Sequence, residues 1–535
     1  MALEIINLHT AQDFVDLSKE LGNDYPVRRI LYAAEVTGCN TAVKETGYDD
    51  EEYKKEYELF YKNVFKGKPP ADVIRIHLFE GILSNLSEEE LTLKSKDDAY
   101  LGYFTLRPTK IQRVCDAFIS EKVITDEESR FVFLTCKIKR SISIEGVNFE
   151  IKGFPYIQQD SRIAACAQCA IRVISQFLGW EEGKSSCLTA PDITEKVKTI
   201  SNAITPDASR QIPTSGLTVP QMKAALGYLN CDPILYDYSN IKPEELFYKH
   251  PEQIIYRYVE SGIPVILGIN TATSKHVLVV IGHSFNPDLW WRYVSESYYQ
   301  LPRSGTDARR HDIRYHSSVD WIQNFVIQDD NLGPYYFMER SLLHNNIACI
   351  LVPLPEKVYL TGEEAELKAY DMIYRDRIET LMNNAVTKLA TVGNPNAQWL
   401  TMYINHWTNK DLVLRTYLRK SEELKGEIDK FTRSASVKNS IVNTPMSKHV
   451  WIVEISWPDI FSHTRKKCGE IILDATADTY LNNAILHVHI PGVIMKKNAA
   501  DELEYVYILD DDQPFRHLYR KKVPIPKHLP MGSIA

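Results

Sequence analysis

The sequence has little of what marks secreted or membrane-embedded proteins. Its nine cysteines are an odd number scattered over 535 residues, which does not fit a disulfide framework. No apolar run approaches the ~18 residues of a membrane-spanning helix. The N-terminus, Met-Ala-Leu-Glu-Ile-Ile-Asn, lacks the basic and apolar regions of a signal peptide. We therefore expect a cytoplasmic protein with no membrane partner, in a reducing compartment where free thiols persist.

The sequence also lacks a surplus of positive charge and several motifs of cofactor sites. A formal net charge of −8 argues against a chain that binds nucleic acid over its whole surface, so no nucleic-acid partner is expected. The motifs Gly-x-x-x-x-Gly-Lys-Ser/Thr, Gly-x-Gly-x-x-Gly, His-Glu-x-x-His and Gly-x-Ser-x-Gly are absent. We expect no nucleotide or other cofactor, no metal, and no serine hydrolase.

The length of 535 residues exceeds what one hydrophobic core usually supports, so several units are expected. The patterning predicts a mainly helical region at 1–97 and a small β subdomain at 98–151. A helix-first, strands-later core follows at 152–355, with a polar insertion at 284–320, and an α+β domain at 356–535. Because helices and strands are segregated along the chain rather than alternating, the predicted fold class is α+β.

The individual elements follow from apolar periodicity and from turn residues. A helix expected from Cys166 to Leu178 is closed by Gly179, and Glu145-Gly146 marks a hairpin turn. Further helices are expected at 219–229 and 363–392. The expected strands are 99–106, 131–139, 142–151, 263–269, 276–282, 325–328, 347–352, 450–456 and 470–473.

Three residues suggest nucleophilic chemistry. Cys166 opens a predicted helix, where the positive end of the helix dipole favours the reactive thiolate. His276 begins one buried strand and Asp329 ends another, so adjacent strand ends would bring imidazole and carboxylate together. A glutamine a few residues upstream offers an amide that could join the Cys166 N–H as an oxyanion donor. The order cysteine, histidine, aspartate is that of papain-like folds.

Four motifs carry a family resemblance. They are Gly-Tyr-x-x-Leu-Arg-Pro at 102–108, Phe-Pro-x-x-Gln-Gln-Asp at 154–160, Cys166-Ala167, and Asp-Asp-x-x-Gly-Pro-Tyr at 329–335. Together with Lys275-His276-Val277, they resemble the papain-like cysteine peptidases that trim double-glycine leader peptides in bacteria. They are more similar still to a broader bacterial group that shares these motifs. The resemblance covers residues 100–355.

The resemblance implies a papain-like core, in which an N-terminal helix packs on an antiparallel sheet. It implies a cysteine hydrolase of peptidase or isopeptidase type, which acts on a protein or peptide through a thioester. Carried over by residue, it implies Cys166 as nucleophile, His276 as base, Asp329 as orienting group and Gln159 as oxyanion donor.

The sequence departs from the leader-peptidase pattern in two places. It has Cys-Ala-Gln where those enzymes commonly have Cys-Gly-Pro, and the gap between Gln159 and Cys166 is slightly long. Gln158 or Asp160 is therefore an alternative at the oxyanion position.

Other interpretations stay open. The core is alternatively a catalytically inactive interaction module, because such folds are often retained after their catalytic activity is lost. Cys166-Ala-Gln-Cys169 has the spacing of thiol–disulfide exchange, although the strand that precedes such motifs is missing. The same pair has zinc-ligand spacing, and His487 and His489 share a strand face, but a structural zinc site lacks a second close pair.

The C-terminal segment repeats part of the pattern. Lys448-His449-Val450 parallels Lys275-His276-Val277, and Asp474 follows in an Asp-x-Thr context similar to transglutaminase-like proteins. Cys468 falls between the histidine and the aspartate, which is the wrong order for a triad. We expect a structural or substrate-binding module here.

Overall fold

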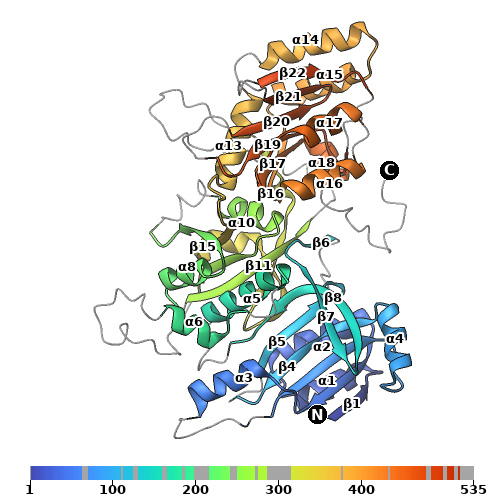
Figure 1. The fold of residues 1–535 in the computed structure, drawn as a ribbon, viewed down its shortest axis with the longest axis vertical. Coiled ribbons are helices and arrows are strands. Elements are labelled where there is room, and N and C mark those ends of the chain that lie inside the picture. Colours follow the sequence, from blue (N-terminus) through green and yellow to red (C-terminus); the bar gives the residue numbers. More distant parts are fainter. Residues whose placement is uncertain are drawn as a thin grey trace.

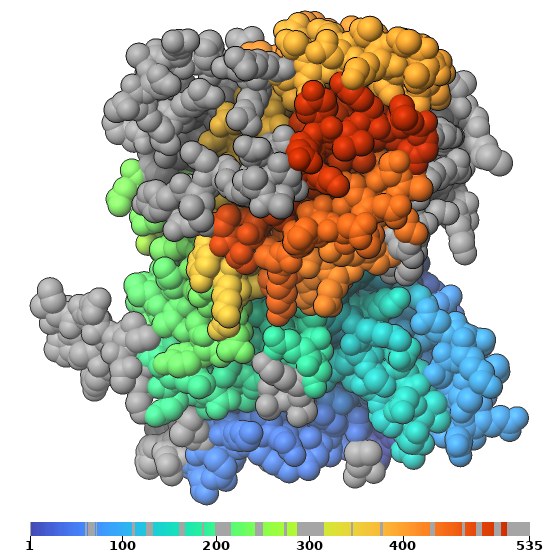
Figure 2. All heavy atoms as spheres, turned by 45° about the horizontal axis from the view of Figure 1, so that its top comes forward, coloured from blue at the N-terminus to red at the C-terminus, as the bar shows by residue number. Residues whose placement is uncertain are grey.

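Three seven-stranded sheets follow one another along the long axis of the molecule (Figure 1), and the described residues add a two-stranded sheet of β18 (Lys466–Lys467) and β23 (Arg516–His517). The computed structural model describes residues 2–62, 70, 72–109, 113–124, 131–159, 166–183, 187–197, 216–240, 250–271, 275–285, 315–374, 378–431, 434–464, 466–477, 484–497, 503–510 and 516–517. The N-terminal sheet lies at one end, the C-terminal sheet at the other, and the middle sheet between them. In Figure 2 the blue, green and orange-to-red parts touch their neighbours along the molecule.

The N-terminal sheet has the order β1-β2-β3-β4-β5-β8-β7, with every neighbouring pair antiparallel. Its strands are β1 (Ala2–Asn7), β2 (Cys39–Thr46), β3 (Ile74–Glu80), β4 (Tyr100–Arg107), β5 (Arg113–Ser120), β7 (Ile138–Ile144) and β8 (Val147–Tyr156). The helices of this region are α1 (Ala11–Glu20), α2 (Tyr25–Thr37), α3 (Glu51–Glu56) with the π-turn η1 (Tyr57–Tyr61), and α4 (Glu88–Lys96).

This sheet contains strands from both sides of the boundary predicted between a mainly helical region at 1–97 and a β subdomain at 98–151. Strands β1, β2 and β3 belong to the same sheet as β4, so the boundary passes through a continuous ladder. The pattern concealed these strands because buried polar residues interrupt the apolar alternation. His77 on β3, for example, is buried and contacts the Tyr100 hydroxyl at 2.8 Å and Glu45 at 3.3 Å.

The expected hairpin turn at Glu145-Gly146 is confirmed. It joins β7 to β8 with Ile144 opposite Val147. Glu145 and Gly146 have φ of 46° and 82°, the left-handed pair that a two-residue hairpin loop favours.

The middle sheet has the order β14-β13-β11-β10-β15-β9, and all its pairs are antiparallel. Its strands are β9 (Cys231–Asp237), β10 (Val265–Asn270), β11 (Lys275–Phe285), β13 (Asn324–Asp329), β14 (Gly333–Glu339) and β15 (Ile347–Pro355). Strand β6 (Phe131–Leu134) also pairs with β11, so the predicted β subdomain contributes to two sheets. The helices around it are α5 (Cys166–Glu181), α6 (Ala190–Val197), α8 (Val219–Gly227), α10 (Pro251–Glu260) and the short α12 (Leu343–Asn346).

Helix α5 lies between the N-terminal and middle sheets, where it contacts β7, β8 and β11. It continues past the predicted stop at Gly179, which is buried inside the helix. The glycine with the left-handed φ that ends a helix is Gly183, at 71°.

Both faces of the middle sheet are covered, which explains its continuous apolar runs. Ile266 and Val279 belong to the core shared with α5 and the N-terminal sheet. The alternate residues Val265 and Val280 belong to the core shared with the C-terminal part.

The C-terminal sheet has the order β12-β16-β17-β19-β20-β21-β22, in which β12 is parallel to β16 and the other pairs are antiparallel. Its strands are β12 (His316–Ser317), β16 (Val413–Lys420), β17 (His449–Ser456), β19 (Gly469–Asp474), β20 (Ile485–Ile490), β21 (Val493–Lys497) and β22 (Leu503–Tyr507). The helix expected at 363–392 is two helices, α13 (Gly362–Ile373) and α14 (Ile378–Thr391).

The remaining helices of this part are α15 (Asn396–Thr408), α16 (Ser421–Phe431), α17 (Ala435–Asn443) and α18 (Pro458–Thr464). The chain is thus a mixed α+β protein, as predicted. Within the described ranges, no helix combines the length and the apolarity needed to cross a membrane.

Candidate active site

The predicted site residues come from three elements and meet at one cavity. Cys166 is the first residue of α5, His276 is the second residue of β11, and Asp329 is the last residue of β13. Strands β11 and β13 are antiparallel neighbours, so the start of one lies beside the end of the other. A cavity of about 360 Å³ is lined by all three residues and by Gln159. Four residues separated by up to 170 positions are therefore brought together.

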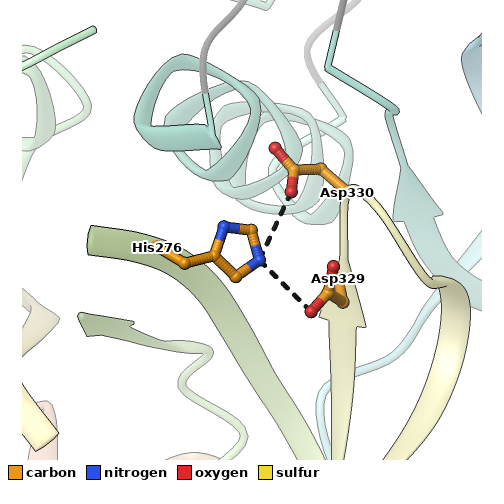
Figure 3. Close-up of side chains that lie close together, drawn as sticks. All are labelled: His276, Asp329 and Asp330. Atoms are coloured by element: carbon orange, nitrogen blue, oxygen red, sulfur yellow. Dashed lines mark hydrogen bonds and ion pairs between the residues drawn. The ribbon is translucent and has the colours of Figure 1, made fainter. Parts of the chain in front are cut away.

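The His276 ring is held by carboxylates on one side. Its Nε2 lies 3.2 Å from Asp329 Oδ2 and 3.6 Å from Asp330 Oδ1 (Figure 3). The other oxygen of Asp329 accepts hydrogen bonds from the backbone N–H groups of Asn331, at 2.8 Å, and Leu332, at 3.1 Å. This Asx-type turn fixes the carboxylate and directs Oδ2 at the imidazole.

The environment of His276 favours the charged ring. Burial by itself lowers the pKa of His276, but hydrogen bonds with Asp329 and Cys166 and the charges of both aspartates outweigh burial and raise this pKa to about 10. For Asp329, burial raises the pKa, and the hydrogen bond with His276 outweighs it and lowers the value below the usual one. The sulfur and the carboxylate thus flank an imidazole that holds its proton. Because Nε2 faces the aspartates, Nδ1 is the ring nitrogen left for the sulfur.

The structure separates the candidates for the oxyanion position. Gln158 is buried and does not line the cavity: its Oε1 accepts from the Val114 N–H at 2.9 Å, and its Nε2 donates to Asp24. Gln159 lines the cavity beside Cys166, with its Nε2 donating to Asn331 Oδ1. Since an amide nitrogen carries two hydrogens, Gln159 keeps one donor for a ligand. Asp160 lies outside the described residues.

Asp330 is the site residue that sequence analysis missed. Neighbouring residues of a strand point to opposite faces, so only one aspartate of the doublet was expected beside the histidine. The strand ends at Asp329, and the turn that follows brings the next carboxylate to the same ring. Asp330 is only 5% exposed, and burial, reinforced by the charge of Asp329 and opposed by that of His276, raises its pKa to about 7.

The N-terminal part supports the turn that carries both aspartates. Arg29 of α2 donates to the carbonyl oxygens of Pro334, at 3.0 Å, and Tyr335, at 2.5 Å. The Tyr335 hydroxyl donates to the Ile119 carbonyl at 2.6 Å and accepts from the Phe154 N–H at 3.0 Å. The motifs at 154–160 and 329–335 therefore contact each other directly, and the turn is anchored from two strands and a helix.

The second cysteine of the Cys-x-x-Cys motif lies behind the first. Cys166 is half-buried at the cavity, whereas Cys169 is 2% exposed and belongs to the apolar core. The two sulfur-bearing residues also share a much smaller void of about 10 Å³ with Asp330.

The C-terminal histidine and aspartate do not form a comparable pair. His449 begins β17 and Asp474 ends β19, and these strands are neighbours. Asp474 Oδ1 instead accepts from the Ser447 hydroxyl at 2.7 Å and the Thr476 N–H at 2.9 Å. Among the described hydrogen bonds, none joins His449 to Asp474.

The histidines considered as zinc ligands, His487 and His489, do not lie near Cys166 and Cys169. His487 contacts the Ser440 hydroxyl at 3.0 Å and His489 contacts Glu470 at 3.4 Å, in the C-terminal sheet and away from the Cys166 helix. The tryptophans of the expected insertion, Trp290 and Trp291, lie outside the described residues.

A scan against protein-family models and a search of curated proteins found no match to the chain. Any function therefore has to be argued from the site itself.

Proposed function

We propose that the chain is a papain-like thiol hydrolase that cleaves an amide bond of a protein or peptide substrate. The observation that carries this proposal is the shared cavity, which both Cys166 and His276 line and at which His276 is hydrogen-bonded to Asp329. A nucleophile, a base and a group that orients the base are the three parts that thioester chemistry requires.

The reaction proceeds in two steps. The Cys166 sulfur attacks the carbonyl carbon, and the negative oxygen is held by the Gln159 amide and the Cys166 N–H. His276 gives its proton to the nitrogen as the carbon–nitrogen bond breaks, which releases the amine and leaves a thioester. Water, deprotonated by His276, then hydrolyses the thioester to a carboxylic acid and restores the thiol.

The test is the rate at which each cysteine reacts with a small alkylating agent such as iodoacetamide, resolved by peptide mass spectrometry. Cys166 should react at least ten times faster than Cys187, which is also half-buried and serves as the internal control. The His276→Ala variant should slow Cys166 to the rate of Cys187, since its thiolate loses its counter-ion. A Cys166 that reacts slowly and equally in both proteins would identify an inert module and overturn the proposal.

Cys169→Ala separates hydrolysis from disulfide exchange. Because Cys169 is buried away from the cavity, we expect the alkylation rate of Cys166 in Cys169→Ala to stay within about twofold of the parent rate. In the parent, we expect no Cys166–Cys169 disulfide to form on oxidation. A Cys166–Cys169 disulfide that forms readily in the parent and supports repeated thiol–disulfide turnover would favour a dithiol enzyme instead.

A further inference from the structure

We propose that His276, Asp329 and Asp330 form a binding site for a divalent transition-metal ion, of which Zn²⁺ fits the donor set, and that an ion bound there blocks the chemistry of Cys166. The three residues supply one imidazole nitrogen and two carboxylates, which are ordinary zinc ligands. The binding itself does not depend on the proposed function, whereas its effect on Cys166 rests on it.

The ligand atoms already have the spacing of a metal centre. One ligand atom from each residue lies within 4.8 Å of the others. A tetrahedral Zn²⁺ with bonds of 2.0–2.1 Å places its ligands about 3.3–3.4 Å apart. The observed separations from His276 Nε2, 3.2 Å to Asp329 and 3.6 Å to Asp330, bracket that value. The two carboxylate oxygens lie within 4.8 Å of each other, so an ion fits between the three atoms once side-chain rotation brings the carboxylates to that spacing.

Asp330 points independently to a cationic ligand. Both of its carboxylate oxygens are buried without a hydrogen-bond partner among the described residues. A buried carboxylate without partners is costly, and it is normally paired or bound to a metal. Figure 3 shows this carboxylate directed at the same ring nitrogen as Asp329. Its ion pair with His276, at 3.6 Å, is longer than a hydrogen bond and therefore leaves both oxygens able to bind a metal ion.

The surroundings of Asp329 match those of a metal ligand. Its non-ligating Oδ1 is fixed by two backbone N–H groups, at 2.8 Å and 3.1 Å. Such outer contacts orient ligating carboxylates and strengthen binding. The backbone of the turn that follows β13 therefore fixes the orientation of one ligand.

Binding changes what His276 can do. The new bond joins the metal to Nε2, and the proton on Nε2 leaves for the solvent. The ring then keeps its remaining proton on Nδ1 and has no free lone pair with which to take a proton from water in the second step of hydrolysis. A metal-bound His276 therefore no longer serves as the base that resolves the thioester, so the metal-bound and hydrolytic states exclude each other.

The binding test uses Cys166→Ala protein, so that the thiol contributes no ligand. Isothermal titration with ZnCl₂ should show one site, and Co²⁺ should give the visible absorption of a tetrahedral complex. Adding Asp330→Asn should weaken binding at least tenfold, and Asp329→Asn provides a second variant if the first does not fold. The matched control is Asp411→Asn, which removes a carboxylate that contacts two histidines elsewhere. Binding that survives Asp330→Asn, or that is lost in Asp411→Asn, would overturn the site.

The second test measures hydrolysis of p-nitrophenyl acetate by the otherwise intact chain with and without ZnCl₂, because Cys166 takes up the acetyl group in a first burst and water must then release it from the thioester. Zinc should slow the steady-state release of p-nitrophenolate at least tenfold, and Asp330→Asn should remove most of that difference. Zinc that binds in the first test but leaves the steady-state rate unchanged would overturn the block. Slow alkylation of Cys166 that does not depend on His276 would instead contradict the proposed function and leave the titration of Cys166→Ala unaffected.

Discussion

Replacing Arg172 with methionine should destabilise the protein, because Arg172 belongs to a buried cluster of opposite charges. Arg172 projects from α5 and pairs with Glu52 and, at 3.7 Å, with Glu56. The cluster contains three arginines and three carboxylates, so its formal charges cancel: Arg107, Arg113 and Arg172 with Asp50, Glu52 and Glu56. It ties the helix that carries Cys166 to α3 and β4 of the N-terminal part.

The size of the effect follows from what remains after the substitution. Removing one partner of a buried ion pair costs about 3–5 kcal/mol, because the other charge is left uncompensated. The lower end applies here for two reasons. Arg107 still contacts Glu56 at 2.8 Å and Glu52 at 3.2 Å, and the Glu52 side chain keeps 20% of its surface exposed. We therefore expect a loss of about 3 kcal/mol in the free energy of unfolding.

The assay is urea unfolding followed by tryptophan fluorescence, applied to the parent, Arg172→Met, Glu52→Gln and the double variant. The double variant restores the charge balance, so it should lie within about 1 kcal/mol of the parent and above the Arg172→Met single variant. The reasoning is refuted if Arg172→Met costs less than about 1 kcal/mol, or if the double variant loses the sum of the two single effects.

Two further predictions concern groups away from the cavity. Burial raises the pKa of Asp411, but hydrogen bonds from His316 and His406 outweigh it and lower the pKa to about 2. The interaction of Asp411 with the two histidines therefore stabilises the folded state fully above pH ~4, and this stabilisation is lost as the pH falls towards ~2. It amounts to about 1 kcal/mol after discounting for a side chain that is 30% exposed. Unfolding of Asp411→Asn should lack that acid-side loss, and an unchanged pH profile would refute the pairing. Tyr335→Phe should lower the free energy of unfolding by about 2 kcal/mol, because two buried backbone groups lose their partner; a loss below about 0.5 kcal/mol in the same urea assay would show that they find others.

The residues around the cavity were predictable because each stands at the end of an apolar run. The run that follows His276 forms β11, and the run before Asp329 forms β13, so the ends of two buried segments located both residues. Cys166 similarly opens an amphipathic helix. What placed them side by side was the antiparallel pairing of β11 with β13, which no local pattern specifies.

Two kinds of feature could not be predicted from the sequence patterns. Strands β2 and β3 carry buried polar residues such as Thr41 and His77, so their apolar alternation is hidden. The partners of His77, Tyr100 and Glu45, lie on the two neighbouring strands. Asp330 escaped because its position depends on a turn rather than on strand periodicity. Gly333, three residues after Asp330, has a φ of 101°, a conformation that favours glycine. This conformation lets the chain reverse direction between Asp329 and Gly333, which pair across β13 and β14.

The predicted core at 152–355 is not an independent unit, because its site is built from outside it. Strand β6 pairs with β11, Arg29 holds the turn after Asp329, and Glu56 pairs with the helix of Cys166. Removing residues 1–151 would expose the apolar face of α5 and leave Arg172 without its carboxylates. The N-terminal part therefore supports the cavity from two sides, because it anchors both the helix that begins with Cys166 and the turn whose aspartates contact His276.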